Sequence, residues 1–148
     1  MNEQLARSGL HQQIGFALRQ ASSAVWSDLV ATLAPFDLRP QVYATLLIVE
    51  ANAGCKQQDI ADALGIHRPN LVALVDDLVA RNLIERSVNA ADRRSYSLVL
   101  TDEGKAHLDA ARAAHKVHEG RIAKALGSAP HSGLIDALTN LAKIGTPR

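Results

Sequence analysis

The sequence has few of the residues that staple small folds or build sheets. A single cysteine among 148 residues cannot form an internal disulfide, so we expect a reducing compartment. Aromatic residues make up only 3% of the chain, and its hydrophobic content of 47% rests mainly on Ala and Leu, which favours helices over sandwiches or barrels. No apolar run approaches the ~20 residues that span a bilayer, and the N-terminus has no signal-peptide core. These absences predict a cytoplasmic protein with no membrane partner.

Sequence signatures of catalysis are also missing. The chain contains no G-x-S-x-G elbow, no phosphate-binding P-loop and no H-E-x-x-H zinc motif. His115 and His118 raise the question of a metal, because they share a helix face, with His107 and His11 elsewhere. No cysteine or carboxylate cluster completes a specific site. We therefore predict no enzyme, no catalytic residue, no cofactor and no metal site, and we place His115 and His118 along a dimer seam or a pocket.

The first part of the chain is predicted to be helical. Apolar residues recur at steps of three and four over residues 10–33, which indicates one long amphipathic helix that Pro35 stops. Arg39-Pro40 opens a second helix, because proline suits a first helical turn, and this helix ends near residues 52–54.

The next segment has the pattern of a helix-turn-helix. One short helix covers about residues 56–64, and Gly65 follows where a left-handed residue ends a helix. The second helix starts near Arg68-Pro69 and ends at Asn82, a residue type that tolerates the left-handed conformation. Two helices joined by a tight turn containing glycine are typical of this DNA-binding motif.

A hairpin and two more helices complete the chain. Residues 83–88 and 96–100 read as strands around a polar loop at 89–95, and a hairpin this small must pack against the helices. Thr101 caps a long helix that ends at Gly127, and a last helix begins near Pro130. We predict a mainly α (α+β) fold, in which a winged helix-turn-helix with a two-stranded wing carries additional N- and C-terminal helices.

The terminal helices predict a dimer. Their apolar faces exceed what a domain of this size can bury within one chain, and a second copy would cover them in an isologous homodimer. We expect a single domain over residues 1–148, with a DNA-binding part at 39–101 and dimerisation helices at 10–33 and 102–146.

The segment DRRSYSLVLTDEG resembles the wing of the multiple-antibiotic-resistance-regulator (MarR) family. Its pattern is D-x-R-x-x-x-L-x-L-T-x-x-G, which fits Asp92, Arg94, Leu98, Leu100, Thr101 and Gly104. Upstream, QQDIADALGI and HRPNLVALVDDLVARNLIER resemble the family's helix-turn-helix and first wing strand, so the likeness covers nearly the whole chain. The resemblance implies a homodimeric transcription factor, usually a repressor, on a pseudo-palindromic double-stranded operator. Many members release DNA when a small aromatic or anionic ligand binds; some sense aryl-CoA thioesters, and others sense oxidants through cysteine.

Six residues are predicted to contact DNA. The first turn of the second helix of the motif meets base edges, and it carries His67, Arg68, Pro69 and Asn70. Arg reads guanine and Asn reads adenine, whereas His67 could serve only as the helix N-cap. In the wing, Arg93 or Arg94 would enter the minor groove, and Asp92 with Arg94 would brace the hairpin. The alternatives are a solvated helix start and a mobile surface loop.

The charge balance argues against a broad basic surface. The net charge is +1, and residues 39–101 contain seven basic and seven acidic residues. The basic footprint of a DNA-binding protein is therefore absent in the sum, and a local patch of Arg68, Arg93 and Arg94 would have to supply it. Asp77 beside Asp76 also departs from similar sequences, in which a basic residue is common at this position.

Four residues are predicted to bind an effector: His11, Arg19, Trp26 and Tyr43. Arg19 lies on the same helix face as Trp26 and would meet a ligand carboxylate or phosphate, although a core Trp and a surface Arg explain the pattern equally simply. Cys55 could sense oxidants, but we predict a small buried apolar residue.

The sequence thus predicts a dimeric, sequence-specific DNA-binding transcriptional regulator, a repressor released by a small organic ligand such as an aromatic acid or its CoA thioester. The alternative is a winged-helix interaction module, an adaptor or antirepressor that does not bind DNA.

Overall fold

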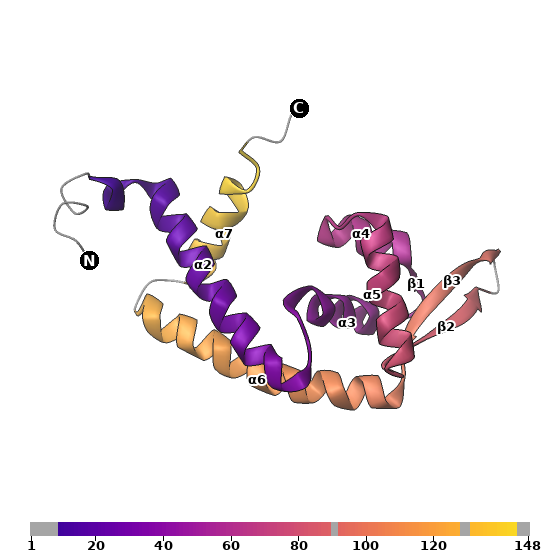
Figure 1. The fold of residues 1–148 in the computed structure, drawn as a ribbon. Helices are drawn as coiled ribbons and strands as arrows, with labels where there is room; N and C mark the ends of the chain where they lie inside the picture. Colours follow the sequence, from indigo (N-terminus) through magenta and orange to yellow (C-terminus); the bar gives the residue numbers. More distant parts are fainter. Residues whose placement is uncertain (1–8, 90–91, 128–130, 145–148) are drawn as a thin grey trace.

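The computed structural model describes residues 9–89, 92–127 and 131–144, and their side chains except those of residues 11, 88, 89 and 92–96. Figure 1 shows a compact group at one end, where short helices gather beside a hairpin, and a more open group of helices at the other. The long helix α6 runs along both. The elements in chain order are η1 (Leu10–Gln12), α2 (Ile14–Leu33), η2 (Ala34–Phe36), α3 (Pro40–Ala51), β1 (Cys55–Lys56), α4 (Gln57–Leu64), α5 (Arg68–Ala80), β2 (Ile84–Asn89), β3 (Asp92–Leu100), α6 (Asp102–Leu126) and α7 (His131–Leu141).

The predicted helix over residues 10–33 is interrupted near its start. Gln13 has an extended backbone, with φ −84° and ψ 124°, which separates the 3₁₀ turn η1 from α2. The amides of Gln12 and Gln13 donate to the carbonyls of Gly9 and Leu10, as expected for a tight turn. Periodicity alone did not reveal the break, because the apolar spacing continues through it.

The helix-turn-helix agrees with the prediction. Gly65 and Asn82 both adopt positive φ, 62° and 56°, at the ends of α4 and α5. Lys56 supplies no side-chain cap to α4, and the Asp59 carboxylate instead accepts a hydrogen bond from the Lys56 amide at 3.1 Å. The motif is therefore bounded by residues whose local preferences match the turn.

The sheet has three strands in the order β1-β3-β2, one more than predicted. β2 and β3 pair from Ile84↔Leu100 to Asn89↔Asp92, so both strands extend further than expected and the seven-residue loop is wrong. β1 pairs Cys55 with Leu98. A two-residue strand is too short to show any alternation in sequence, and this explains why it was missed.

The core lies where α3, α4, α5 and the sheet meet α6. Side chains exposed by 1% or less include Leu46, Val49, Ile60, Leu71, Val75, Leu78, Ile84, Leu98 and Leu108. At the other end, α2, α7 and the last turn of the described chain expose large apolar side chains, among them Ile14, Val25, Trp26, Val30, Ile135, Leu138 and Ile144. Within the described residues, no helix is long and apolar enough to cross a membrane.

The junction between the hairpin and α6 explains part of the wing motif. Thr101 Oγ1 accepts a hydrogen bond from the Gly104 amide at 2.8 Å and donates one to the Asn82 carbonyl at 2.6 Å. A Cβ atom at Gly104 would stand 1.9 Å from the Leu83 carbonyl oxygen. The T-x-x-G spacing therefore joins a helix cap to a close backbone contact.

Candidate nucleic-acid interface

The first turn of α5 faces solvent. Arg68, Pro69 and Asn70 are all exposed, whereas Leu71 and Val75 on the opposite face are fully buried. Pro69 suits the first turn of α5, because an amide N–H at this position would have no acceptor within the helix and its absence costs no hydrogen bond. The buried face fixes the helix on the core, so its first turn projects outward with an arginine and an amide side chain. This is the placement that base readout in a major groove requires.

His67 occupies the N-cap position of α5 but caps through its backbone. Its carbonyl oxygen accepts from the amides of Asn70 and Leu71 at 2.9 and 3.2 Å, and its ring makes no cap hydrogen bond. The imidazole is exposed beside Arg68. Both interpretations of His67 from the sequence, N-cap and DNA contact, are compatible with this geometry.

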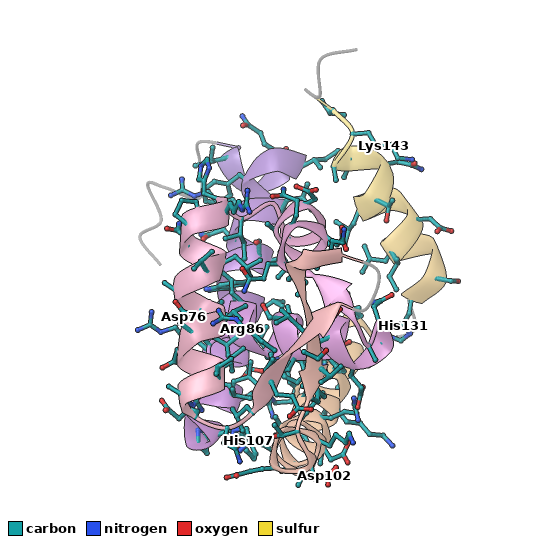
Figure 2. All side chains as sticks on the ribbon, turned by 90° about the vertical axis from the view of Figure 1, so that its right-hand side faces the viewer. Asp76, Arg86, Asp102, His107, His131 and Lys143 are labelled. Atoms are coloured by element: carbon teal, nitrogen blue, oxygen red, sulfur yellow. The ribbon has the colours of Figure 1, made fainter. Side chains whose placement is uncertain are left out.

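The acidic residues on the back of α5 are paired. Asp76 forms an ion pair with Arg86 of β2, which Figure 2 shows on the face of α5 beside the hairpin. Asp77 lies 3.4 Å from Arg81, which also approaches Asp37 at 3.7 Å. Within the described residues, Arg68 has no such carboxylate partner. The net charge of residues 39–101 is zero, but the charges are unevenly placed. The carboxylates on the back of α5 are paired with arginines, whereas Arg68 at its start has no carboxylate partner among the described residues.

The wing residues Asp92, Arg93 and Arg94 belong to β3 by their backbones, and their side chains lie outside the described part. Figure 1 shows the hairpin projecting beyond α5, away from the rest of the molecule. The bracing role of Asp92 and Arg94, and the entry of an arginine into the minor groove, stay predictions.

Two adjoining hollows lie between the open helices and the DNA-binding motif. The first, about 470 Å³, is lined by Trp26 and Val30 of α2 together with Leu38 and Arg39. The second, about 450 Å³, lies between α3 and α5 and includes Arg39, Asn70, Leu74 and Arg81. Both share Asp37, Arg39 and Gln41. One end of the joint space is apolar and aromatic. The other is polar and holds Arg39 together with Arg81 and its two carboxylate partners, Asp37 and Asp77.

Of the predicted effector residues whose side chains the structure describes, only Trp26 lines either hollow. Trp26 lines the first hollow, but Arg19 is exposed and lines neither of these two. Tyr43 is 5% exposed, and its ring lies 5.2 Å from that of His115, between centroids. Burial raises the pKa of the Tyr43 hydroxyl. The side chain of His11 lies outside the described part. Arg39 was missed as a pocket residue because its place before Pro40 already explained it as a helix start.

A polar cluster joins α2 to α6. His118 is 1% exposed, and its Nδ1 lies 2.5 Å from Oδ2 of Asp28. The same carboxylate accepts from Nη2 and Nε of Arg121 at 2.7 and 3.1 Å. The hydrogen bonds from Arg121, and then from His118, lower the pKa of Asp28. The interior of one chain therefore encloses His118. The predicted place of His115 and His118 along a dimer seam or a pocket stays a prediction.

Cys55 is half-buried in β1 and packs against the core. Burial raises the pKa of its thiol, and the neighbouring Asp59 adds to the effect. This environment disfavours the thiolate that an oxidant sensor needs. The side chain behaves as the small apolar residue that was predicted, although it is not fully buried.

Comparison with known proteins places these features in a family. The family model described as MarR family matches residues 36–95. The transcriptional repressor CouR, solved bound to a 23-mer DNA duplex, is 38% identical with a TM-score of 0.85, over 92% of this chain and 96% of that one. CouR bound to p-coumaroyl-CoA is 35% identical with a TM-score of 0.80, over 93% and 96% of the two chains.

A curated relative gives a shorter match. A candidate transcriptional regulatory protein for the hcr operon of Thauera aromatica is 28% identical over 102 residues. The match takes in 68% of this chain but only 61% of that protein's length. The chain thus spans less than two thirds of this relative.

Proposed function

The chain belongs to the MarR family of transcriptional regulators, and we propose that it is a homodimeric repressor that binds a specific operator and leaves it when a small organic ligand binds. The observation that carries the proposal is the exposed first turn of α5, where Arg68 and Asn70 project from a helix whose other face is buried. The proposed DNA-binding part is residues 39–101. The proposed dimerisation helices are residues 10–33 and 102–146, within one domain.

Dimerisation is supported by the apolar side chains that α2 and α7 leave exposed. Ile14 and Ile135 are 71% and 63% exposed, which is unusual for side chains of this size in a folded protein. A twofold axis would bury the same faces of both copies. It would also set two recognition helices about 34–36 Å apart, one turn of DNA.

The ligand class follows from the two adjoining hollows. An aromatic group would pack against Trp26 and Val30. A carboxylate or phosphate would meet Arg39, which, unlike Arg81, has no carboxylate partner among the described residues. An aromatic acid or its CoA thioester has both features, and p-coumaroyl-CoA is the ligand of the CouR complex. Asn70 lines the second hollow, so an occupied site would reach the recognition helix itself.

Release of DNA would be a shift of population between two dimer arrangements. The ligand moves this equilibrium only by its difference in affinity for the two states. An occupied hollow favours a dimer whose recognition helices no longer match the spacing of the grooves, and the operator affinity falls accordingly.

A mobility-shift titration on the DNA upstream of the chain's own gene tests the DNA-binding proposal. We expect nanomolar binding that resists excess random DNA and weakens from low to high salt, because neutralised phosphates release counterions. Arg94→Ala should weaken binding, whereas an adaptor or antirepressor would be unaffected by that change. Binding that random DNA removes completely would contradict a specific operator at this locus.

The same assay tests the effector. Added p-coumaroyl-CoA should release the DNA, and free CoA serves as the control that lacks the aromatic acid. Trp26→Ala should raise the concentration of p-coumaroyl-CoA needed for release, because it removes the aromatic wall of the first hollow. An equal response to free CoA would contradict the aromatic part of the proposal.

A further inference from the structure

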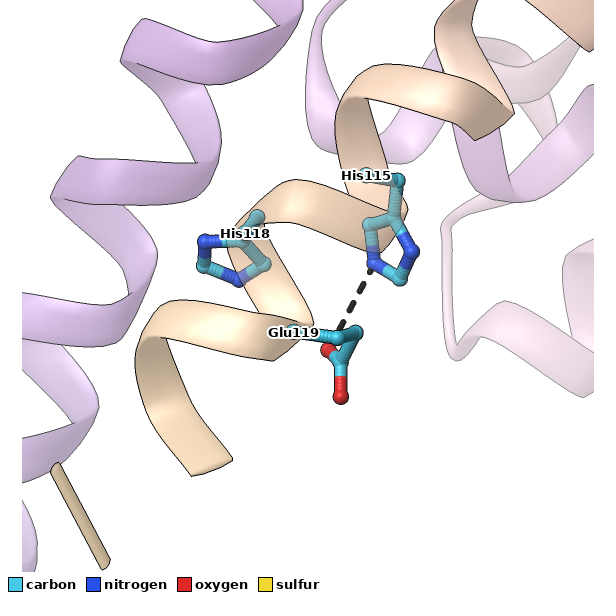
Figure 3. A group of neighbouring side chains, drawn as sticks. All are labelled: His115, His118 and Glu119. Atoms are coloured by element: carbon cyan, nitrogen blue, oxygen red, sulfur yellow. Dashed lines mark ion pairs between the residues drawn. The ribbon is translucent and has the colours of Figure 1, made fainter. Parts of the chain in front are cut away.

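Three potential metal ligands converge on one stretch of α6. The ligand atoms of His115, His118 and Glu119 all lie within 4.8 Å of one another. Figure 3 shows these three side chains on α6. The spacing of three and four residues places them around one turn of the helix. Their position is the junction at which α6 meets Asp28 of α2 and Tyr43 of α3.

His118 is held in the orientation that a metal-binding imidazole needs. Its Nδ1 meets the Asp28 carboxylate at 2.5 Å, and because a carboxylate only accepts, Nε2 is the ring nitrogen left for a metal ion. Arg121 donates two hydrogen bonds to the same carboxylate oxygen and fixes it. A carboxylate behind a histidine orients the ring and strengthens it as a ligand in many metal sites. This contact joins residues 90 positions apart, so no local pattern in the sequence could predict it.

His115 and Glu119 complete the donor set. Nε2 of His115 lies 3.7 Å from Oε1 of Glu119, and the two imidazole centroids are 5.6 Å apart. Donor atoms around a tetrahedral zinc stand roughly 3.3 Å from one another, given bonds of about 2.0–2.2 Å. The longest separation must therefore close by about 1.5 Å. The Glu119 side chain is 59% exposed and the His115 side chain 30%, so rotation of these two can close the site while His118 stays fixed.

We propose that His115, His118 and Glu119 bind one Zn²⁺ ion per chain and that Asp28 is the positioning residue behind His118. Two imidazole nitrogens and one carboxylate oxygen suit zinc, and they do not suit Mg²⁺ or Ca²⁺, which prefer oxygen alone. A fourth position stays open to water or another small ligand. The ion links α6 through His118 to α2, and so stabilises the junction between the open helices and the DNA-binding part.

Zinc titration of the purified full-length chain, after removal of metal with a chelator, tests this site. We expect one equivalent of Zn²⁺ by calorimetry, a higher unfolding temperature with zinc, and visible absorption bands typical of low coordination number when Co²⁺ replaces it. His115→Gln and Glu119→Gln should each weaken zinc binding at least tenfold. The matched controls are His131→Gln on α7 and Glu85→Gln on β2, which lie away from the cluster and should bind as the parent does.

Asp28→Asn separates a site from a chance cluster. It leaves all three ligands in place and removes the charge that orients His118, so we expect zinc affinity to fall ten- to a hundredfold with the circular dichroism spectrum unchanged. His118 itself is too deeply buried for a clean substitution. Failure of the chain to bind zinc, or a zinc affinity in His115→Gln and Glu119→Gln equal to that of the parent chain, would overturn the proposal. None of these measurements involves DNA, so the outcome is independent of the proposed operator binding.

Discussion

Both ends of the molecule are built from amphipathic helices, but the apolar faces of these helices are buried at one end and exposed at the other. Around α3, α4 and α5 the apolar side chains close on one another, and Leu46, Ile60 and Leu71 are completely buried. Along α2, α7 and the turn after it, comparable side chains stay open, with Ile14 at 71% and Ile144 at 77% exposure. One end is thus complete within a single chain. We propose that the other is completed by a second copy.

Charge follows the same division within α5. Its later turns hold Asp76 and Asp77, and each carboxylate has an arginine partner. Its first turn exposes Arg68 and Asn70 without such pairing among the described residues. Because Asp76 and Asp77 are neutralised by their arginine partners, they repel DNA only weakly. These two residues therefore give little support to the alternative of an adaptor that has lost DNA binding. We call the part around α3, α4 and α5 the closed end, and the part formed by α2, α7 and the turn after it the open end. Four experiments test how the two ends differ in stability, association and DNA binding.

The closed end should fail where its backbone is tightest. Gly104→Ala places a Cβ atom 1.9 Å from the Leu83 carbonyl oxygen, which must move and take the start of β2 with it. We expect the free energy of unfolding to fall by about 3 kcal/mol or more, measured by urea denaturation. Gly120→Ala on the same helix is the control, since its Cβ meets nothing within 4 Å, and it should gain about 0.5–1 kcal/mol. Equal effects at both positions would contradict the close contact.

A charge on the exposed apolar face of α7 should weaken the proposed dimer without unfolding the chain. Ile135→Glu puts a charge on an apolar face of α7, where each copy would give up the burial of one large side chain, roughly 1.5–3 kcal/mol. Because a twofold interface counts the change twice, we expect the dimer dissociation constant to rise about a hundredfold or more by sedimentation equilibrium. Asn140→Glu, exposed on α7 five residues later and therefore off this face, is the control. A parent chain that sediments as a monomer would exclude the proposed dimer.

The exposed first turn of α5 should matter for DNA and not for stability. Arg68→Ala removes an exposed side chain, so the unfolding curve should not move, while specific DNA binding weakens by ~1–3 kcal/mol, or roughly 5- to 150-fold. Lys116→Ala on α6 is a matched loss of one exposed positive charge away from this helix. Equal weakening by both substitutions in a mobility-shift assay would indicate general attraction to phosphate rather than base readout.

The closed end was also the more predictable from sequence. Turns and helix ends can be predicted from residues with strong backbone preferences, here Gly65, Pro69 and Asn82, and the structure confirms those boundaries. The break at Gln13 has no such marker. The two-residue strand β1 gains its conformation only by pairing with β3. Local chemistry is visible in a sequence, whereas pairing across the fold is not.

The same limit applies to the sites. Arg68 and Asn70 could be placed because a helix start is a local feature, and the structure exposes them as expected. The contact of Asp28 with His118 and the double role of Arg39 depend on helices meeting in space. For that reason, only Trp26 of the predicted effector residues with described side chains lines either hollow.

The smallest expected effect is a change in the alkylation rate of Cys55, which is half-buried in β1 at the edge of the core. Burial raises the pKa of its thiol, and this disfavours the thiolate that alkylating agents and peroxides attack. We therefore expect iodoacetamide to modify Cys55 several-fold more slowly in the native chain than in urea at neutral pH. The native rate should rise with pH to a midpoint above the ordinary value near 8.5, because the protonated form is the one that burial favours. Mass spectrometry of timed samples gives both rates from this single cysteine. Fast native labelling at neutral pH would mean that the thiol is open and reactive, and the oxidant-sensing role set aside above would have to be considered again.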